Sequence, residues 1–171
     1  MQRRELPLPR CITGKPPEEV PQGERRSQAV TRGEKDQGCT MLFLNPRGEV
    51  LMLLRDDKPG IPYPNMWDLP GGHLEKGEGP REGICREMRE ELPGVDLGNF
   101  RPLQVVEFPE RIDHFFWTRL DVPAEELNRV LREGQRAAWM SLEAIREVKV
   151  AFGVKDIIEA FLARVEKGEL D

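Results

Sequence analysis

The feature that most constrains this chain lies at residues 71–95, where a glycine-rich stretch leads into an acidic helix. Gly79-Pro80 is a typical helix start, because a proline at the first helical position loses only an N–H that has no partner there. No residue breaks a helix over 80–92, and Pro93-Gly94 is typical of a helix end. The pattern therefore predicts one uninterrupted helix in this stretch.

Three carboxylates share one face of this predicted helix. Glu87, Glu90 and Glu91 stand at spacings of three and four, which bring side chains together one turn apart. Like charges so close repel one another, and a divalent cation would turn that repulsion into binding, since hard oxygen ligands suit Mg²⁺ or Mn²⁺. The alternative is an acidic face that is simply solvated, which is common on helices. The helix alone leaves both interpretations open.

The loop before the helix favours the first interpretation. Loop and helix together carry specified residue types at fixed spacings, namely Gly72, Glu78, Arg86, Glu87, Met88, Glu90 and Glu91. This arrangement resembles the Nudix box, G-x5-E-x7-R-E-U-x-E-E-x-G-U with U apolar, and every position from Gly72 to Glu91 matches. The final glycine of the pattern falls on Pro93, and Gly94 follows one residue later. That departure affects the turn after the helix and leaves the carboxylates in frame.

The rest of the chain predicts an α/β fold. Apolar runs at 39–45 and 49–55, joined by the turn Asn-Pro-Arg-Gly, predict a β-hairpin. Further strands are expected at 103–107, 112–120 and 137–140, and apolar residues at helical spacing over 154–165 predict an amphipathic helix. Strands around a central helix, with another helix last, predict a mixed sheet covered on both faces. This agrees with the Nudix α/β/α sandwich, a mixed β-sheet flanked by the box helix and a C-terminal helix.

Shorter elements complete the expectation. Residues 56–66 contain three prolines and one glycine and are expected to form a loop, and 123–131 a short helical excursion. Ser141 is a candidate N-cap for a helix over 142–148. Residues 1–36 are poor in large apolar side chains, so we expect a weakly structured segment with at most a strand near 28–30. Residues 37–171 are then expected to form one Nudix domain.

Composition limits the classes of partner. The net charge is −5 and the pI about 5.3, which argues against stable nucleic-acid binding through a basic patch. An anionic substrate would then need a metal ion to offset the repulsion. Three scattered cysteines, Cys11, Cys39 and Cys85, indicate reduced thiols. No apolar run approaches the roughly 18 residues of a membrane span, and the N-terminus lacks a hydrophobic signal region. We expect a cytoplasmic monomer or homodimer.

The resemblance also implies an activity. Nudix enzymes hydrolyse nucleoside diphosphates linked to another moiety, by attack of metal-activated water on phosphorus. For a MutT-like member it implies nucleoside di- or triphosphates as substrates, with Mg²⁺ or its substitute Mn²⁺ held by Glu87, Glu90, Glu91 and the Gly72 carbonyl. Glu90 and Glu91 are the implied catalytic carboxylates. The alternatives are another nucleoside diphosphate derivative, such as a nucleotide sugar or dinucleoside polyphosphate, or a Nudix-fold sensor that binds nucleotide without cleaving it.

Four further residues are candidates for the site. Arg86 is expected to be an orienting residue rather than a ligand, which pairs with a carboxylate of the box such as Glu78 and so holds loop and helix together. Arg55, at the end of a predicted strand, is either a phosphate clamp or solvated. Glu133, in a segment similar to one that supplies a late catalytic glutamate, is either a general base or extra metal ligand, or an exposed loop residue. Phe108 is the fourth candidate, for binding the substrate. Glu107, Glu110 and Asp113 are rivals for the role of base. Phe108 and four other aromatic residues could stack on a nucleobase or, as aromatic residues usually do, belong to the core, namely Tyr63, Phe115, Trp117 and Phe152.

Histidine and amide chemistry add little to this prediction. His73 and His114 are expected to be structural, because no second histidine stands at ligand spacing from either one. MutT-like guanine recognition uses an asparagine near the start of the final helix. Residues 151–153 read Ala-Phe-Gly here, without an amide side chain. The resemblance therefore does not extend to guanine specificity.

Overall fold

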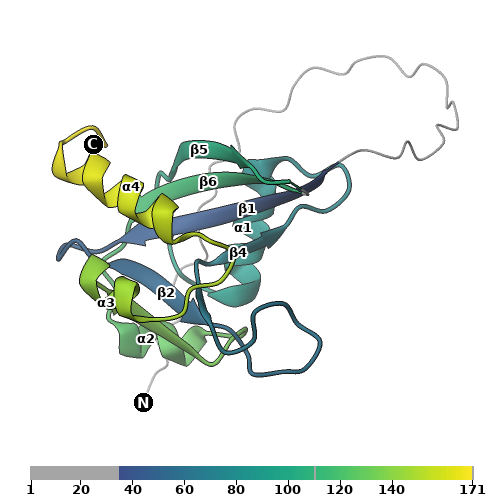
Figure 1. The fold of residues 1–171 in the computed structure, drawn as a ribbon, viewed down its shortest axis with the longest axis horizontal. Coiled ribbons are helices and arrows are strands. Elements are labelled where there is room, and N and C mark those ends of the chain that lie inside the picture. The colour runs from purple at the N-terminus through teal and green to yellow at the C-terminus, as the bar shows by residue number, and fades with distance from the viewer. Residues whose placement is uncertain (1–34, 110, 171) are drawn as a thin grey trace, which may run out of the picture.

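The computed structural model describes residues 35–109 and 111–170 (Figure 1). The expected weakly structured segment, apart from residues 35 and 36, and the strand near 28–30 lie outside the described residues. Within the described part, strands and helices follow one another as β1 (Asp36–Leu44), β2 (Val50–Leu54), β3 (Trp67–Asp68), β4 (Gly71–His73), α1 (Pro80–Glu91), β5 (Arg101–Glu107), β6 (Arg111–Arg119), α2 (Ala124–Val130), β7 (Arg136–Met140), α3 (Leu142–Glu147) and α4 (Lys155–Glu166).

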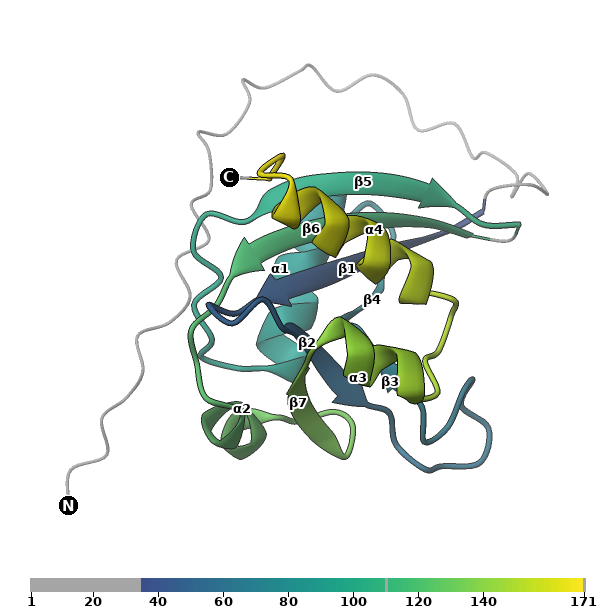
Figure 2. The ribbon, with the colours of Figure 1, turned by 60° about the vertical axis from the view of Figure 1, so that its left-hand side comes forward.

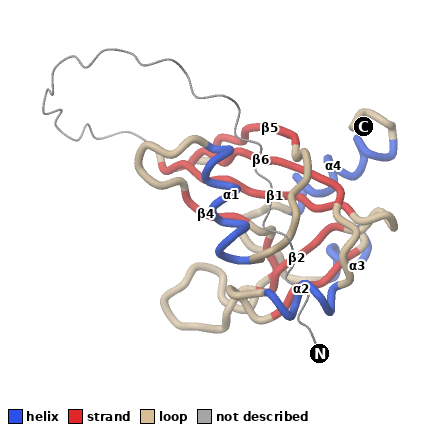
Figure 3. Tube along the Cα trace, turned by 180° about the vertical axis from the view of Figure 1, so that it is seen from behind, coloured by secondary structure: helices blue, strands red, loops and turns tan. Residues whose placement is uncertain are grey.

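The strands form one mixed sheet of seven strands, in the order β3-β2-β1-β6-β5. β1 lies at its centre, parallel to β6 and antiparallel to β2 and β4, and β7 pairs with β2. Helix α1 lies behind the sheet in Figure 1 and in front of it in Figure 3, whereas α4 covers the opposite face. The predicted α/β/α sandwich is therefore confirmed.

The two faces of the sheet bury separate cores because successive side chains of a strand point to opposite sides. On β1, Met41 and Phe43 belong to the core that includes Ile84 and Met88 of α1. Their neighbours Leu42 and Leu44 pack instead in the core that contains Phe161 and Ile158 of α4. A strand buried on both faces reads as a continuous apolar run, which is why 39–45 shows no polar alternation.

Several local predictions are confirmed. Helix α1 begins at Pro80 behind Gly79, whose N–H donates to Glu82 Oε2 at 3.0 Å, and its last residue is Glu91, close to the expected end at 92. Ser141 caps α3, since its Oγ accepts a hydrogen bond from the Ala144 N–H at 3.3 Å. The other expected strands and helices occur, with ends that differ by up to three residues.

Two short strands, β3 and β4, were not predicted. Gly71–His73 was expected to belong to a loop, but it forms β4, which pairs with Cys39 and its neighbours on β1. Gly71 has a φ of 146° and packs so closely on β1 that a Cβ there would collide with the Cys39 carbonyl oxygen. Only glycine tolerates this approach, and its lack of a side chain also removes the apolar signal by which a strand is recognised.

No helix in the described part of the chain combines the length and the apolar character that crossing a membrane would require. The loop between β2 and β3 projects from the sheet beside the start of β7 (Figure 2). This loop contains the predicted 56–66 segment, and it forms one wall of the candidate site.

Candidate functional site

Two adjoining cavities open where β4, α1 and the loop after β2 meet. The larger has a volume of about 450 Å³ and the smaller about 260 Å³. They share Arg55, Ile61, Asp68, Leu69 and Gly71, so they form one cleft divided near Arg55 and Asp68. Carboxylates of α1 and of the loop after α2 line the larger part, and a cluster of aromatic and charged side chains lines the smaller.

The α1 carboxylates differ in exposure. Glu91 is buried, with 8% of its surface exposed, and its Oε2 accepts a hydrogen bond from the Gly71 N–H at 3.0 Å. Burial raises the pKa of Glu91 well above its ordinary value, the Gly71 hydrogen bond opposes this, and the charges of Glu87 and Glu133 add to the rise. The side chain of Glu90 remains half exposed.

Glu87 lies against β4. A Cβ at Gly72 of β4 would collide with the Glu87 carboxylate, so any other residue there would displace this side chain. Burial raises the pKa of Glu87, the bond to Arg86 opposes this, and Glu90 and Glu133 raise it further. Glu87 and Glu91 therefore share an excess of negative charge with Glu133.

Arg86 joins the loop to the helix, as its predicted pairing with Glu78 requires. Its Nε and Nη2 each donate to Glu78 at 3.0 Å, in a fork-to-fork arrangement, and Nη2 also donates to the His73 carbonyl at 2.8 Å. Nη1 donates to Glu87 at 2.9 Å and to Glu90 at 3.3 Å. One guanidinium therefore sets the positions of two of the candidate metal ligands.

Glu133 reaches the same cavity from a distant part of the chain. It lies in the turn between α2 and β7, and the N–H groups on either side of it are held in place. The Arg132 N–H donates to the carbonyl of Glu91 at 2.9 Å, and the Gln135 N–H donates to that of Leu54 at 2.7 Å. Glu133 and Glu91 both line the larger cavity.

The rival bases lie elsewhere. Glu107 forms an ion pair with Lys35 at 2.6 Å, at the end of β5. Asp113 lies in the smaller cavity, where it pairs with Arg111 at 2.6 Å. Glu110 is outside the described residues. Of the three candidates that the structure describes, Glu133 alone lines the cavity that also contains Glu91.

The donor set fits a hard divalent cation. Among the described residues, no three His, Cys, Asp or Glu side chains are already arranged as a metal cluster. The nearby candidates nevertheless offer only oxygen atoms. Burial is the main cause of the raised pKa values of Glu87 and Glu91, and the charges of neighbouring carboxylates add to the rise, which a cation would offset. Glu87, Glu90, Glu91 and the Gly72 carbonyl, which now accepts a weak hydrogen bond from Cys39 Sγ at 3.7 Å, would hold such an ion.

Arg55 lies where the two parts of the cleft meet, and three contacts fix its side chain. Its Nη1 donates to Asp68 at 3.2 Å, its Nε donates to the Pro62 carbonyl at 3.1 Å, and the guanidinium lies 5.1 Å from the centre of the Phe152 ring. Burial raises the pKa of Asp68 to about 6, although the Leu69 N–H and Arg55 both oppose the rise. An isolated acidic residue in a sequence does not indicate that it fixes an arginine, so this role of Asp68 was not predicted.

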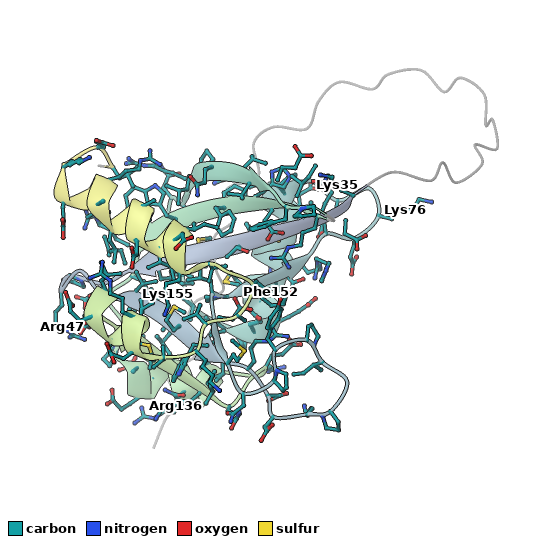
Figure 4. The ribbon with its side chains drawn as sticks, viewed as in Figure 1. Lys35, Arg47, Lys76, Arg136, Phe152 and Lys155 are labelled. Atoms are coloured by element: carbon teal, nitrogen blue, oxygen red, sulfur yellow. The ribbon has the colours of Figure 1, made fainter. Side chains whose placement is uncertain are left out.

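The aromatic candidates separate into core and cleft. Phe115 and Trp117 are buried in the α4-side core, so they cannot stack on a ligand. Phe108 is partly buried in the same core, with Arg111 5.3 Å from its ring centre, and it lines neither part of the cleft. Phe152, labelled in Figure 4 between α3 and α4, does line the smaller cavity.

Phe152 lies between two guanidinium groups. Arg111 is 4.6 Å from its ring centre, close to the corresponding distance for Arg55, and Tyr63 meets it edge-on at 4.6 Å. Its φ of 53° is rare for an aromatic residue, and backbone strain of this kind is often found at functional sites. The sequence prediction named Phe152 only as one of several aromatics and missed Arg111 altogether.

Comparison with known proteins identifies the class. Residues 35–161 match the family model for the NUDIX domain. Because this match covers most of the chain, the protein belongs to the Nudix family, as the box and the α/β/α sandwich indicate.

Particular relatives were found by sequence. The chain is 34% identical over 108 residues to a protein named RNA pyrophosphohydrolase from Gluconacetobacter diazotrophicus, covering 60% of this chain and 58% of that one. It is 37% identical over 81 residues to an 8-oxo-dGTP diphosphatase from Escherichia coli K12, covering 46% and 60%. The chain thus spans less than two thirds of the length of these relatives.

Solved structures share the fold. A mutT/nudix family protein from Listeria innocua has a TM-score of 0.64 at 22% identity, covering 82% of this chain and all of that one. The NUDIX domain of Shewanella oneidensis NrtR, complexed with ADP ribose, has a TM-score of 0.63 at 16% identity, covering 78% and 90%. Identities this low establish the architecture alone.

Proposed function

We propose that this protein is a Mg²⁺-dependent hydrolase of the phosphoanhydride bond in nucleoside di- or triphosphates, with Mn²⁺ as a substitute ion. The observation that carries the proposal is the convergence of Glu91 and Glu133 on one cavity that also contains Arg55. A cavity lined by both carboxylates and a guanidinium suits a metal ion together with the phosphates that it binds. The names of the relatives, pyrophosphohydrolase and diphosphatase, support the same class of reaction.

Each residue has a distinct proposed role. Glu87, Glu90, Glu91 and the Gly72 carbonyl would hold the ion, which when bound supplies positive charge against the phosphates and favours deprotonation of water. Glu133, fixed by its neighbours beside Glu91, would accept the proton of the attacking water as general base. These groups act at the phosphorus and are the proposed catalytic and metal-binding residues.

The remaining roles concern position and binding. Arg86 keeps Glu87 and Glu90 oriented through the bonds it donates to both carboxylates. Arg55 would bind a phosphate oxygen, because a guanidinium donates to phosphate in a fixed geometry. The smaller cavity would take the nucleoside, with Phe152 and Arg111 rather than Phe108 at its wall.

A second candidate substrate is the 5′-triphosphate end of RNA. Similarity to proteins named RNA pyrophosphohydrolase favours it. The net charge of −5 favours a small free nucleotide instead, because the chain lacks the excess of basic residues that binds a nucleic-acid backbone. Nucleotide sugars and dinucleoside polyphosphates remain the other substrate alternatives, and a nucleotide sensor is the alternative without catalysis.

The test is a panel of nucleoside di- and triphosphates, linked diphosphates and 5′-triphosphorylated RNA, with and without Mg²⁺ or Mn²⁺. Phosphate release is followed with and without added pyrophosphatase, which separates loss of phosphate from loss of pyrophosphate. We expect Glu90→Gln and Glu91→Gln each to lower kcat by at least about a hundredfold. Glu166→Gln, on the exposed end of α4, is the matched control and should retain wild-type turnover.

Three results would count against this proposal. Metal-independent turnover would contradict the cation role, and wild-type turnover in both box variants would contradict the catalytic assignment. A folded protein that binds nucleotide with Mg²⁺ but releases nothing from any compound in the panel would be a sensor.

The cellular setting is also a proposal. Cys39 is a buried thiol that forms no disulfide, which fits a reducing compartment such as the cytoplasm. A monomer or homodimer is expected, and sedimentation at several protein concentrations would distinguish the two.

A further inference from the structure

We propose that Gln135 is a positioning residue that connects the turn bearing Glu133 to the loop at 56–66. This inference rests on the proposed function, because it assigns a task to a residue beside the proposed base. Gln135 lies two residues after Glu133, in the segment whose resemblance points to a catalytic glutamate but assigns no role to the glutamine.

The side-chain amide of Gln135 contacts both ends of the loop. Gln135 Nε2 donates to the carbonyl of Arg55 at 2.7 Å and to Oδ1 of Asn65 at 3.0 Å. Both N–H groups of the amide are thereby used, which a glutamate or an apolar side chain could not reproduce. The backbone N–H of Gln135 adds a bond to the Leu54 carbonyl at 2.7 Å.

The residues that Gln135 contacts close the loop. The Arg55 N–H donates to the Met66 carbonyl at 2.9 Å, and the Asn65 N–H donates to the Asp56 carbonyl at 3.1 Å. Asn65 has a φ of 56°, a conformation that asparagine adopts more readily than most residues. Gln135 therefore binds the loop at the point where its two ends meet.

Hydrogen bonds lead from this point in both directions. On one side, Arg55 Nε donates to the Pro62 carbonyl, so the proposed phosphate clamp and the tip of the loop are joined. On the other side, the Arg132 N–H donates to the Glu91 carbonyl, so the turn with Glu133 is joined to the end of α1. Gln135 is the side chain that links these two sets of contacts.

The consequence concerns the approach of the base. When a nucleotide contacts Arg55 and the loop, Gln135 holds the turn with Glu133 in register with them. Loss of the amide would leave each part folded but no longer held relative to the other. Binding and the chemical step should both suffer, which a purely structural contact would not produce.

The first experiment uses the full-length protein with Mg²⁺ and whichever of ATP, GTP, CTP, UTP and their deoxy forms it hydrolyses fastest. Gln135→Leu should lower kcat/KM by about tenfold, through both a higher KM and a lower kcat. Gln104→Leu, the same substitution on β5 at the far edge of the sheet, should leave both constants unchanged. Unchanged constants in folded Gln135→Leu, or a lowered Tm alone, would overturn the proposal.

A pair of variants at Asn65 separates the hydrogen bond from the shape of the loop. Asn65→Asp keeps an oxygen acceptor and tolerates the positive φ, so it should retain activity within about twofold. Asn65→Gly keeps the φ but removes the acceptor, and it should reproduce part of the Gln135→Leu defect. If the two variants behave alike, the acceptor has no role.

Hydrogen–deuterium exchange tests the link without any turnover. Asn65→Gly, although it lies in the other segment, should speed exchange in a peptide covering residues 132–135 by about fivefold. Unchanged exchange there would refute the link. If the wild type cleaves nothing in the panel but this exchange is coupled, the hydrolase proposal fails while the connection stands.

Discussion

Asp68 is a partly buried carboxylate that should make the stability of this protein fall as the pH rises. Its pKa is raised from 3.8 to about 6 by burial, so the folded protein holds the Asp68 proton more tightly than the unfolded chain does. The stabilising contribution is present below about pH 4, is lost as the pH rises through 6, and is absent at pH 7.5. Asp68→Asn removes the ionisation and keeps the shape.

The expected magnitude follows from the pKa. A pKa that rises from 3.8 to about 6 on folding contributes about 3 kcal/mol to the free energy of unfolding at low pH. About 2.5 kcal/mol of this contribution is lost between pH 4 and pH 7.5. Asp68→Asn also removes the ion pair with Arg55, which forms only as Asp68 ionises, and its effect is already contained in the pKa of about 6. The change in the difference between variant and wild type therefore isolates Asp68.

The assay is urea unfolding of both proteins at a series of pH values, in chelator so that metal binding does not contribute. We expect the variant to gain stability relative to the wild type by about 2.5 kcal/mol from pH 4 to pH 7.5. A difference that stays constant, or moves in favour of the wild type, would refute the reasoning. In turnover assays the same variant should raise KM about fivefold, because Arg55 loses one of its fixed partners.

Three further predictions concern metal, guanidinium and thiol. Mg²⁺ at about a hundred times its Kd should raise the wild-type Tm by about 8 °C, and Glu91→Gln should show less than half of this rise in a thermal scan; an equal rise in both would exclude Glu91 as a ligand. Arg86→Lys keeps the charge but cannot reproduce the fork, so kcat should fall about tenfold in steady-state assays with far-ultraviolet circular dichroism unchanged; full activity would show that the fork is dispensable. Cys39 is 1% exposed, and burial raises its pKa to about 12. Maleimide should therefore label it at least about a hundredfold faster in urea than in buffer, as measured by peptide mass spectrometry. Rapid labelling in buffer would contradict this.

Sequence alone predicted the elements whose causes are local. The start of α1 at Gly79-Pro80, the Ser141 cap of α3 and the turn between β1 and β2 each depend on a few adjacent residues. The shared face of the α1 carboxylates follows from helical spacing, and the pairing of Arg86 with Glu78 from a box of fixed frame. These features need no knowledge of the rest of the fold.

Tertiary structure decided which residues of distant segments lie close to those elements. Glu133 meets Glu91 because backbone bonds hold its turn against α1 and β2, and many residues separate it from both partners in the chain. The same packing buries Phe115 and Trp117 while leaving Phe152 at the cleft, although all three are aromatic residues in apolar surroundings of the sequence. Composition cannot distinguish them.

One physical reason explains why some features follow from the sequence and others only from the tertiary structure. Helix starts, turns and one-face spacings are set by backbone angles of neighbouring residues, which the sequence specifies directly. The roles of Asp68, Arg111 and Gln135 arise from contacts between segments brought together by burial of two apolar cores on a mixed sheet. The sequence by itself determined the proposed metal-binding helix. Only the tertiary structure decided which residues are proposed as base and phosphate clamp, and which amide joins their two segments.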